Sequence, residues 1–366
     1  MKANELEENI RIYSDKKGLY ESFCLKLNDL LTYLINEANI PYHIIESRVK
    51  SVESFKEKLQ REGKNYKKPL DEITDFVGLR IILYYPKDID TIVGIIKEEF
   101  LIDTKNSIDK KKLLKDNEVG YLSVHQVISV KGARSKLPEW KTSKKLKAEI
   151  QVRTVLQHTW ASISHTLQYK REIDIPTQFR RRLNRLAGLL ELADEEFESL
   201  KFEQNELELK ISKSIEEKDL DLPIDYLTVD DYLKKSDINR GIKNYIESKK
   251  NTILDIEDDE KLISQIILVL SHFGIKTIKT LDKLLIKNKD QFINFFENLM
   301  PVEEGSNWVG SSGTFLIIFL MGLLKKNKKD LKELYEKLEW VDSFLLDEIS
   351  KSNITTANNG NRCTSP

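Results

Sequence analysis

The sequence predicts an α/β fold over residues 1–215 and an all-α domain over residues 225–350. Three observations lead to this prediction. Helical and strand-like patterns alternate along the first part of the chain, which is typical of helices packed around a small sheet. The segment 147–170 changes from period two to a helical period in mid-course. From residue 225 onward the apolar spacing is almost wholly helical, and a chain of 366 residues exceeds a typical single domain.

The first elements follow from local patterns. We expect a helix over residues 10–38, a second helix over 44–61, a strand over 79–85 that is broken before it by Gly78 and stopped by Pro86, and a helix over 88–99. Residues 119–130 and 148–153 read as further strands. The core face of the first helix is predicted to consist of Leu25, Leu27, Leu30, Leu31 and Leu34.

The segment 147–170 is predicted to run from a strand straight into a helix. In the strand, Ala148, Ile150 and Val152 point to one face, and Lys147, Glu149, Gln151 and Arg153 to the other. From Leu156 the apolar residues repeat at helical spacing, and the opposite side of that helix carries His158, Ser162, His165 and Tyr169. Either this polar side belongs to a site, or it is an exposed strand edge with two surface histidines.

The rest of the chain is predicted to leave this α/β unit on a long helix after Pro176, with apolar spacing through Phe179, Leu183, Leu186, Leu190, Phe197 and Leu200. The segment 218–231, with Pro223 and several acidic residues, is the best candidate for a domain boundary. The polar tail, residues 351–366, is expected to be disordered.

Composition limits the classes of function. The chain has 59 Lys+Arg against 60 Asp+Glu and a formal net charge of −1, so any binding of a polyanion must be local. Its two cysteines, Cys24 and Cys363, show no zinc-binding spacing and fit a reducing compartment. The charged start lacks a signal-peptide pattern, and the longest apolar run, residues 314–324, is too short to span a bilayer. We therefore expect a cytoplasmic protein with no membrane partner and a buried helix at residues 314–324.

Three groups of residues suggest phosphate chemistry. On a helix, Lys50, Ser54, Lys58 and Arg61 would form one stripe that suits a polyphosphate, although neighbouring glutamates also allow a solvated helix face. Asp75 and Glu149 are carboxylates on two strands that could together hold one Mg²⁺ ion, which in proteins usually also binds substrate phosphates. Tyr121, Ser123 and His125 alternate on another strand, where they could stack a base and bind its phosphates or ribose.

Four motifs contain these residues: R-x-K-x-x-x-S-x-x-x-K-x-x-R from Arg48 to Arg61, D-x-x-G-x-R from Asp75 to Arg80, G-Y-x-S-x-H from Gly120 to His125, and E-I-Q-V-R-T from Glu149 to Thr154. In order, spacing and residue type, they resemble the synthetase domain of the RelA/SpoT family of (p)ppGpp synthetases over residues 40–200. The resemblance implies a nucleotidyltransferase-like mixed sheet flanked by helices. It also implies transfer of the β,γ-pyrophosphate of ATP to the 3′-hydroxyl of GDP or GTP, with Mg²⁺ as cofactor.

The resemblance further assigns roles to individual residues. Asp75 and Glu149 would bind Mg²⁺, and Glu149 would also take the proton of the 3′-hydroxyl. Arg48 and Arg80 would sandwich the adenine, and Lys50, Ser54, Lys58 and Arg61 would belong to the ATP site. The residues assigned to the acceptor are Tyr121, which would stack its base, His125, which would contact its phosphates, and Ser123, Gln151, Arg153 and His158.

The match departs from the family pattern in two places. The loop before Gly120 is lysine-rich at Lys110–Lys112 and lacks the proline and asparagine of the long synthetases, and His158 stands where some members carry asparagine. The hydrolase motif of the bifunctional members has no counterpart, and His158 and His165 are about 10.5 Å apart along a helix, too far for one ion. We therefore expect synthesis without hydrolysis.

Two alternatives stay open. Some relatives are toxins that pyrophosphorylate the 3′ end of tRNA and are restrained by a C-terminal domain until a phage protein binds, which for this chain would give exposed cations such as Lys144, Lys145, Arg180, Arg181 and Arg182 a role. The C-terminal helical domain would then be regulatory, or else it mediates homo-oligomerisation or binds a protein partner. A non-catalytic nucleotide sensor is the third hypothesis, but a mere binder would not need the second carboxylate at Glu149.

Overall fold

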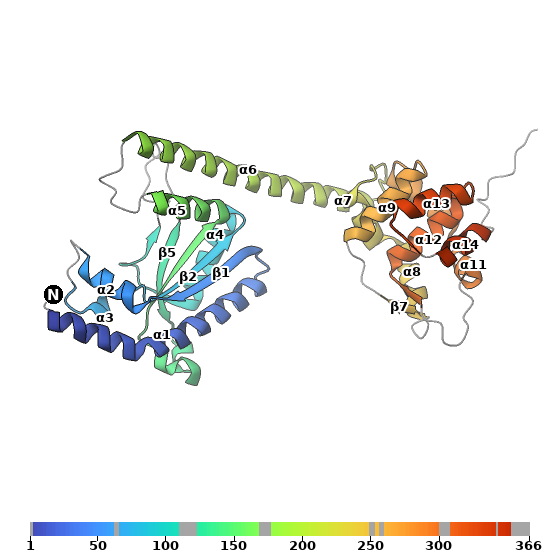
Figure 1. Ribbon diagram of the computed structural model, residues 1–366. Helices are drawn as coiled ribbons and strands as arrows, with labels where there is room; N and C mark the ends of the chain where they lie inside the picture. Colours follow the sequence, from blue (N-terminus) through green and yellow to red (C-terminus); the bar gives the residue numbers. More distant parts are fainter. Residues whose placement is uncertain are drawn as a thin grey trace, which may run out of the picture. The chain divides into compact units, whose positions relative to one another are not determined.

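The structure, a computed structural model, describes residues 3–61, 66–109, 123–167, 177–248, 253–255, 260–299, 308–341 and 343–352. The chain forms two compact units, Met1–Phe202 and Glu203–Pro366, each with its own hydrophobic core (Figure 1). The helix α6 (Thr177–Glu216) begins in the first unit and ends in the second. The predicted boundary segment around Pro223 lies in the second unit, where Pro223 pairs with Thr277. The functional division into a synthetase domain and a regulatory or oligomerisation domain stays a prediction.

The first unit is built on a mixed sheet, which confirms the predicted α/β class. Its strands run in the order β1-β2-β6-β5-β3, with β4 also paired to β5. The β2–β6 pair is parallel, and the other pairs are antiparallel. The strands are β1 (Tyr42–Val49), β2 (Val77–Leu83), β3 (Phe100–Ile102), β4 (Ile108–Asp109), β5 (Val124–Val130) and β6 (Ala148–Thr154).

Helices flank this sheet. In Figure 1, α1 runs along one side of the sheet, and α5 and the first part of α6 lie on the other. The helices that precede α6 are α1 (Ala3–Glu37), α2 (Val52–Gln60), α3 (Pro69–Glu72), α4 (Pro86–Glu99) and α5 (Val155–Leu167), with 3-10 turns η2 (Arg134–Lys136) and η3 (Pro138–Ser143). The predicted helix over 88–99 is confirmed as α4, and the predicted strand over 79–85 is β2, in which Gly78 continues the strand rather than breaking it.

The core of the first unit lies between α1, α4 and the sheet. Leu27 and Leu31 are buried as predicted, Leu30 and Leu34 are partly buried, but Leu25 is 65% exposed and was wrongly placed in the core. The reason is that aromatic residues of α1 set its inward face. Tyr13 and Tyr20 pack with Phe55 of α2 and Phe76 just before β2, at ring-centroid distances of 4.8 to 5.6 Å.

The predicted helix over residues 44–61 is wrong in its first half. Residues Tyr42–Val49 form β1, an edge strand antiparallel to β2, and only Val52–Gln60 are helical. Tyr42, Ile45 and Val49 are the partly buried positions of β1, at a spacing that imitates a helix because the register shifts between Tyr42 and Ile44. Ser51 then caps α2 by accepting a hydrogen bond from the Ser54 N–H.

The predicted change from strand to helix is confirmed at β6 and α5. Ala148, Ile150 and Val152 have no exposed surface, as the alternation requires. The helix begins after Thr154 because Thr154 and Gln157 cap each other reciprocally: Thr154 Oγ1 accepts from the Gln157 N–H, and Gln157 Oε1 accepts from the Thr154 N–H, both at 3.1 Å. Among the apolar residues that repeat at helical spacing along α5, Ile163 and Leu167 are more than half exposed.

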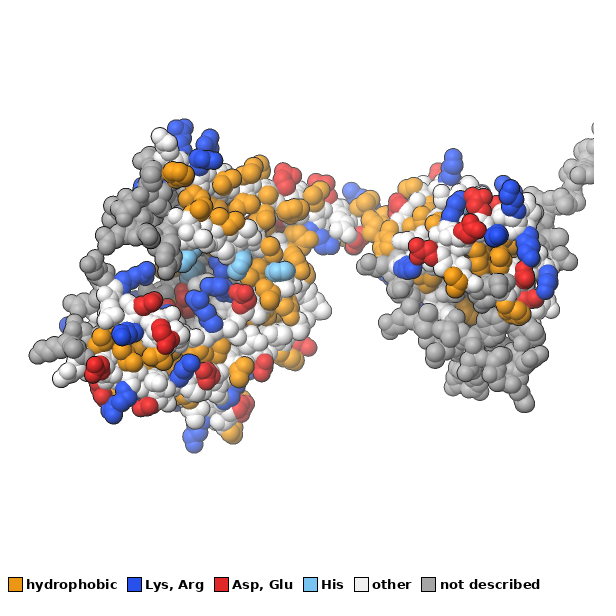
Figure 2. All heavy atoms as spheres, in the orientation of Figure 1, with side chains coloured by type: hydrophobic (Ala, Val, Ile, Leu, Met, Phe, Trp, Pro, Cys, Tyr) orange, Lys and Arg blue, Asp and Glu red, His pale blue; other side chains and the backbone are white. Residues whose placement is uncertain are grey.

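On α6 the inward face also differs from the apolar spacing. Leu183 and Ala187 are buried, whereas Phe179, Leu186, Phe197 and Leu200 are more than half exposed. Figure 2 shows apolar side chains gathered along this helix.

The second unit is mostly helical, as predicted. Its α12 consists almost entirely of buried residues, which confirms the buried helix expected at residues 314–324, and no described helix is long and apolar enough to cross a membrane. Residues 353–366 of the predicted tail lie outside the described residues. The elements are α7 (Tyr226–Lys235), α8 (Asp237–Ser248), β7 (Ile253–Asp255), α9 (Glu260–His272), α10 (Ile278–Lys287), α11 (Lys289–Leu299), β8 (Trp308–Gly310), α12 (Ser312–Leu324), α13 (Lys328–Lys337) and α14 (Ser343–Lys351).

A buried carboxyl group joins α6 to the end of β6 and makes the stability of the first unit depend on pH. Asp194 is 4% exposed and accepts a hydrogen bond from Thr154 Oγ1 at 2.7 Å. Burial raises the pKa of Asp194 to about 6, and Glu198 and Glu191 add to this effect. This pKa lies above that of an aspartate in the unfolded chain. The stability that Asp194 contributes is therefore fully present at low pH and is lost as the pH rises through about 6.

We therefore expect Asp194→Asn, which stays neutral and still accepts the Thr154 hydrogen bond, to stabilise the chain at pH 7.5 by about 1–2 kcal/mol. The gain should disappear at pH 4. Thermal unfolding of both chains across this pH range measures it, and a gain that does not change with pH would contradict the account.

Candidate active site

The register of the sheet brings polar residues of four strands into two adjacent rows. Across the first row, Arg48 of β1 pairs with Gly78 of β2, and Gly78 pairs with Glu149 of β6. The second row consists of Glu46, Arg80, Gln151 and His125, in that order across β1, β2, β6 and β5. Because residues two apart in a strand point to the same face, both rows lie on one face of the sheet.

A cavity of about 230 Å³ lies over these rows. A Cβ atom at Gly78 would lie 3.8 Å from Arg48 Cγ, an ordinary contact, so the glycine leaves space beside Arg48 rather than relieving a clash. Figure 2 shows charged and histidine side chains around a hollow in this unit. The cavity is lined by Glu46, Ser47, Arg48, Asp75, Gly78, Leu79, Arg80, Glu149 and Gln151.

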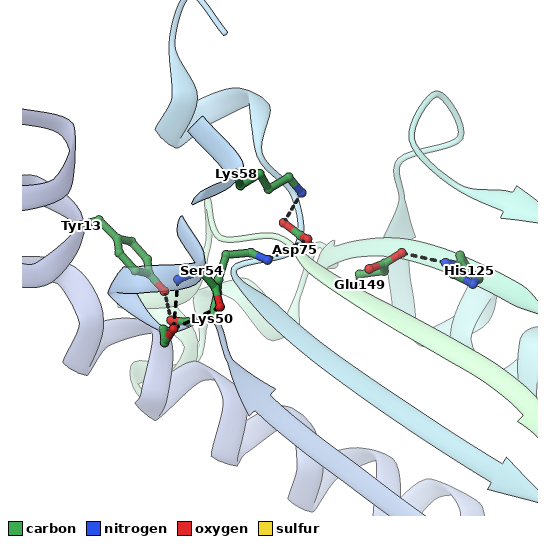
Figure 3. A network of polar contacts seen from close by, with 8 residues as sticks. Tyr13, Lys50, Ser54, Lys58, Asp75, His125 and Glu149 are labelled. Atoms are coloured by element: carbon green, nitrogen blue, oxygen red, sulfur yellow. Dashed lines mark hydrogen bonds and ion pairs between the residues drawn. The ribbon is translucent and has the colours of Figure 1, made fainter. Parts of the chain in front are cut away.

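Asp75, which lies just before β2, is held by two lysines. Lys58 Nζ lies 2.8 Å from Asp75 Oδ1, and Lys50 Nζ lies 3.1 Å from Oδ2 (Figure 3). Burial alone would raise the pKa of Asp75, but the two ammonium groups outweigh burial and hold that pKa below its usual value. The carboxylate is therefore ionised at neutral pH and sits between two cations.

The backbone of Lys50 is fixed on both sides. Its N–H donates to the Phe76 carbonyl at 2.9 Å, and its carbonyl accepts from the Tyr13 hydroxyl at 2.5 Å. Burial raises the pKa of Tyr13 to about 12, so the hydroxyl keeps its proton and remains a donor at neutral pH. Lys50 therefore projects from a short segment between β1 and α2. Hydrogen bonds to Phe76 and to Tyr13 of α1 hold this segment in place.

Glu149 is the second carboxylate of the cavity. His125 Nδ1 lies 2.8 Å from Glu149 Oε1, and His125 Nε2 lies 2.8 Å from Ser123 Oγ. Burial and the charge of Asp75 would raise the pKa of Glu149, but His125 and Gln151 hold it below its usual value. Two ionised carboxylates thus line the same cavity, each with its own polar partner.

Arg80 lines the cavity, and His158 lies close enough to Arg80 and Glu46 to interact with their charges. Arg80 Nη1 lies 3.4 Å from Glu46 Oε2, with about a third of the Arg80 side chain exposed. On α5, His158 is half-buried, and its burial together with the positive charge of Arg153 lowers its pKa, so the imidazole is neutral at pH 7. Its Nδ1 atom has no hydrogen-bond partner among the described residues.

The structure brings together some of the residues predicted for the site but not all. Asp75, Glu149, Arg48, Arg80 and Gln151 line the cavity, while Lys50, Lys58 and His125 contact its carboxylates. The predicted stripe does not exist as one helix face, because Lys50 precedes α2 and Arg61 follows it.

Four other residues predicted for the site do not line the cavity: Ser54, Arg61, Arg153 and Ser123. Ser54 and Arg61 are exposed, and Arg153 is only 5% exposed. Ser123 reaches the site through His125. Tyr121 and Lys110–Lys112 lie outside the described residues.

Glu46 and Tyr13 belong to the site although no local sequence pattern predicted them. Glu46 lies directly across from Arg80 in the β1–β2 pair, so a strand assignment for residues 42–49 would have found it. Tyr13 supports Lys50 from a helix 37 residues earlier, and no local pattern signals that contact.

The two carboxylates fit a Mg²⁺ ion that completes its shell with other oxygens. Among the described residues, no group of three or more His, Cys, Asp and Glu side chains could hold a metal ion. Mg²⁺ is commonly held by one or two carboxylates, with water and substrate phosphates as the other ligands. Asp75 and Glu149 supply such a donor set, since both are ionised and both line the cavity.

Much of the chain that forms this cavity matches a known protein family. Residues 47–174 match the model of the region found in RelA / SpoT proteins. The chain is 32% identical over 173 residues to GTP pyrophosphokinase YwaC of Bacillus subtilis (strain 168). This match covers 47% of this chain and 79% of YwaC. It is 30% identical over 200 residues to GTP pyrophosphokinase YjbM of the same organism, which covers 53% of this chain and 88% of YjbM.

Solved structures are also similar to part of the chain. Small alarmone synthetase 2 from Bacillus subtilis is 29% identical and covers 52% of this chain and 98% of its own, with a TM-score of 0.42. Small alarmone synthetase 1 from the same organism, bound to its product pppGpp, is 26% identical and covers 54% of this chain and 98% of its own, with a TM-score of 0.43.

The matched region, residues 47–174, runs from the end of β1 past the end of α5, and so contains both carboxylates and their partners. The two relatives are matched over more than three quarters of their own lengths, at 30% identity or more. The chain therefore belongs to the RelA/SpoT family, as a relative of its GTP pyrophosphokinases.

Proposed function

We propose that the first unit transfers the β,γ-pyrophosphate of ATP to the 3′-hydroxyl of GDP or GTP and so makes (p)ppGpp. The observation that carries this proposal is the pair of ionised carboxylates, Asp75 and Glu149, in one cavity beside Arg48 and Arg80. The activity named for the relatives, GTP pyrophosphokinase, supports a guanine nucleotide as acceptor. Phosphoryl-type transfer depends mainly on positioning and charge neutralisation, and this cavity is equipped for both.

On the donor side, cations would hold the ATP. Arg48 and Arg80 would enclose the adenine, because guanidinium groups stack on aromatic rings. Lys50 and Lys58 would move from Asp75 to the phosphates, since both ammonium groups already point into the same polar region (Figure 3). Arg61, exposed after α2, can reach a polyphosphate only if it swings inward.

When the lysines leave Asp75, its carboxylate needs another cation. Asp75 and Glu149 would hold Mg²⁺, which when bound neutralises charge on the phosphates of ATP. The proposal therefore makes binding of ATP and of Mg²⁺ mutually dependent. Without Mg²⁺, moving the two lysines away would leave Asp75 as a partly buried carboxylate with no cation beside it, which is unfavourable.

On the acceptor side, Glu149 would act as the general base. Its lowered pKa keeps it ionised, and its place in the cavity allows a 3′-hydroxyl to approach within hydrogen-bond distance. Gln151 and His158 would lie beside the ribose or base of the acceptor, and Tyr121 would stack the base. We also propose that the chain has no hydrolase activity. The second unit would have a regulatory role or mediate oligomerisation.

The proposal predicts which acceptor receives the label when the full chain is incubated with Mg²⁺ and ATP labelled at the γ position. GDP or GTP should become labelled, and Glu149→Gln should lower the rate by about 10²- to 10⁴-fold, since it removes a general base while keeping the size of the side chain. Deacylated tRNA is offered in parallel. Thin-layer separation of nucleotides and gel separation of tRNA measure the transfer.

Each outcome of this acceptor test has a clear meaning. Label in tRNA alone would show a tRNA pyrophosphokinase and contradict the proposed acceptor. No label in any acceptor, both for the full chain and for a fragment of residues 1–220, would contradict the enzyme itself.

A second prediction concerns the lysines. Lys58→Met keeps the length of the side chain but removes one of the two cations at Asp75, so we expect the KM for ATP to rise by about tenfold or more. The matched control is Lys56→Met, because Lys56 is exposed on the same helix. Steady-state kinetics at saturating acceptor measure both, and equal KM values for the two variants would contradict a role for Lys58 in ATP binding.

A further inference from the structure

One side of the helix α6 carries a row of apolar residues that the first unit leaves uncovered. Each residue of this row is more than half exposed, and Figure 2 shows the apolar side chains along the helix. Successive members are 7, 3, 8 and 3 residues apart, which places them on one side of a helix. We call these five residues the α6 row: Phe179, Leu186, Leu189, Phe197 and Leu200.

A different side of the same helix faces the first unit. Leu183, Ala187 and Asp194 are at most 7% exposed, and Asp194 accepts a hydrogen bond from Thr154 at the end of β6. The helix is therefore attached to its own unit through these residues. The α6 row is not needed for that attachment and stays available to another surface.

The α6 row is large enough to form an interface. A half-exposed Phe or Leu leaves roughly 100 Å² of apolar surface in water, so five leave about 500 Å², near the upper end of what monomeric proteins expose in one patch. Two such rows packed together would bury about 1,000 Å² in total, the size at which a specific interface becomes feasible.

Charge is distributed unevenly along this part of α6. Residues 180–185 include four arginines, and no acidic residue occurs from 177 to 190, whereas residues 191–198 include five acidic residues and no basic one. Arg182, Arg185 and Glu196 are exposed. They lie along one edge of the α6 row, because their separations of 3 and 11 residues are close to one and three helical turns. One half of this edge is thus basic and the other acidic.

We propose that the α6 row binds the α6 row of a second copy of the chain, with the two helices antiparallel. In such a pair, centred near Leu189, the basic half of each edge lies beside the acidic half of the other, whereas a parallel pair would set arginines against arginines. Phe179 then meets Leu200 of the second copy, and Leu186 meets Ala193, whose small side chain leaves room for a leucine. Two identical copies satisfy this arrangement because it has twofold symmetry. The inference does not depend on the proposed function.

Sedimentation velocity of the full chain, from about 1 to 100 µM, tests the pairing. We expect a concentration-dependent dimer. Leu186→Lys places a charge within the α6 row and should weaken dimerisation by about tenfold or more, while the exposure of this position should leave the circular dichroism spectrum unchanged. The matched control is Leu209→Lys. Leu209 is also exposed on α6, but it lies nine residues from Leu200 and therefore on the opposite side of the helix, so this variant should dimerise like the wild-type chain.

Two results of this experiment would overturn the proposal. A wild-type chain that stays monomeric at every concentration would show that no second copy covers the α6 row. A dimer that persists unchanged in Leu186→Lys would show that the copies associate through another surface.

Charge reversal tests the antiparallel orientation. Arg185→Glu makes both halves of the edge more acidic, and Glu196→Arg makes both more basic, so each variant alone should dimerise about threefold or more weakly than the wild-type chain. An equimolar mixture should form a heterodimer, because each acidic group of one variant then lies beside a basic group of the other. Native mass spectrometry of the mixture counts the three species. A random distribution of homodimers and heterodimers would contradict the antiparallel pair, and a heterodimer in the mixture also shows that both variants fold.

Discussion

The parallel pairing of β2 with β6 is the constraint on which the site depends. Its register sets Gly78 beside Glu149 and Arg80 beside Gln151, and β1 then adds Arg48 and Glu46 to the same two rows. A slip of one residue in this pair would turn every polar side chain of β6 toward the core and every apolar one toward the cavity. The buried side chains Ala148, Ile150 and Val152 make such a slip costly, so the apolar face of β6 fixes the position of the polar one.

The three carboxylates of the site have polar partners before any substrate binds. Asp75 lies between two lysines, Glu46 lies beside Arg80, and Glu149 is held by His125. This pairing explains how a half-buried cluster of charges is compatible with a stable fold, because a partly buried charge left alone would be costly. It also defines what a substrate must do. To recruit the lysines, a polyphosphate would have to exchange partners with Asp75.

Much of this site could be predicted from sequence, because local alternation is a reliable signal wherever one face of a strand is buried. That signal placed Glu149 and Gln151 on one face of β6. It also placed Ser123 and His125 on one face of the predicted strand 119–130, of which Val124–Val130 form β5. It failed at β1, an edge strand whose buried positions repeat at nearly helical spacing, and so Glu46 was missed. It also could not find Tyr13, whose contact with Lys50 depends on tertiary packing. The exposed apolar residues of α6 show the same limit, since spacing alone does not say which side of a helix is covered.

In the proposed reaction, one cavity would align ATP, an acceptor hydroxyl and the base Glu149 by exchanging the partners of its charged groups. A crystal structure of the chain with a non-hydrolysable ATP analogue, GDP and Mg²⁺ tests this most directly. We expect Lys50 and Lys58 on the phosphates rather than on Asp75, and the 3′-hydroxyl of GDP about 3 Å from a carboxylate oxygen of Glu149. Nucleotides bound elsewhere, or both lysines still on Asp75 with ATP analogue in the cavity, would contradict the account.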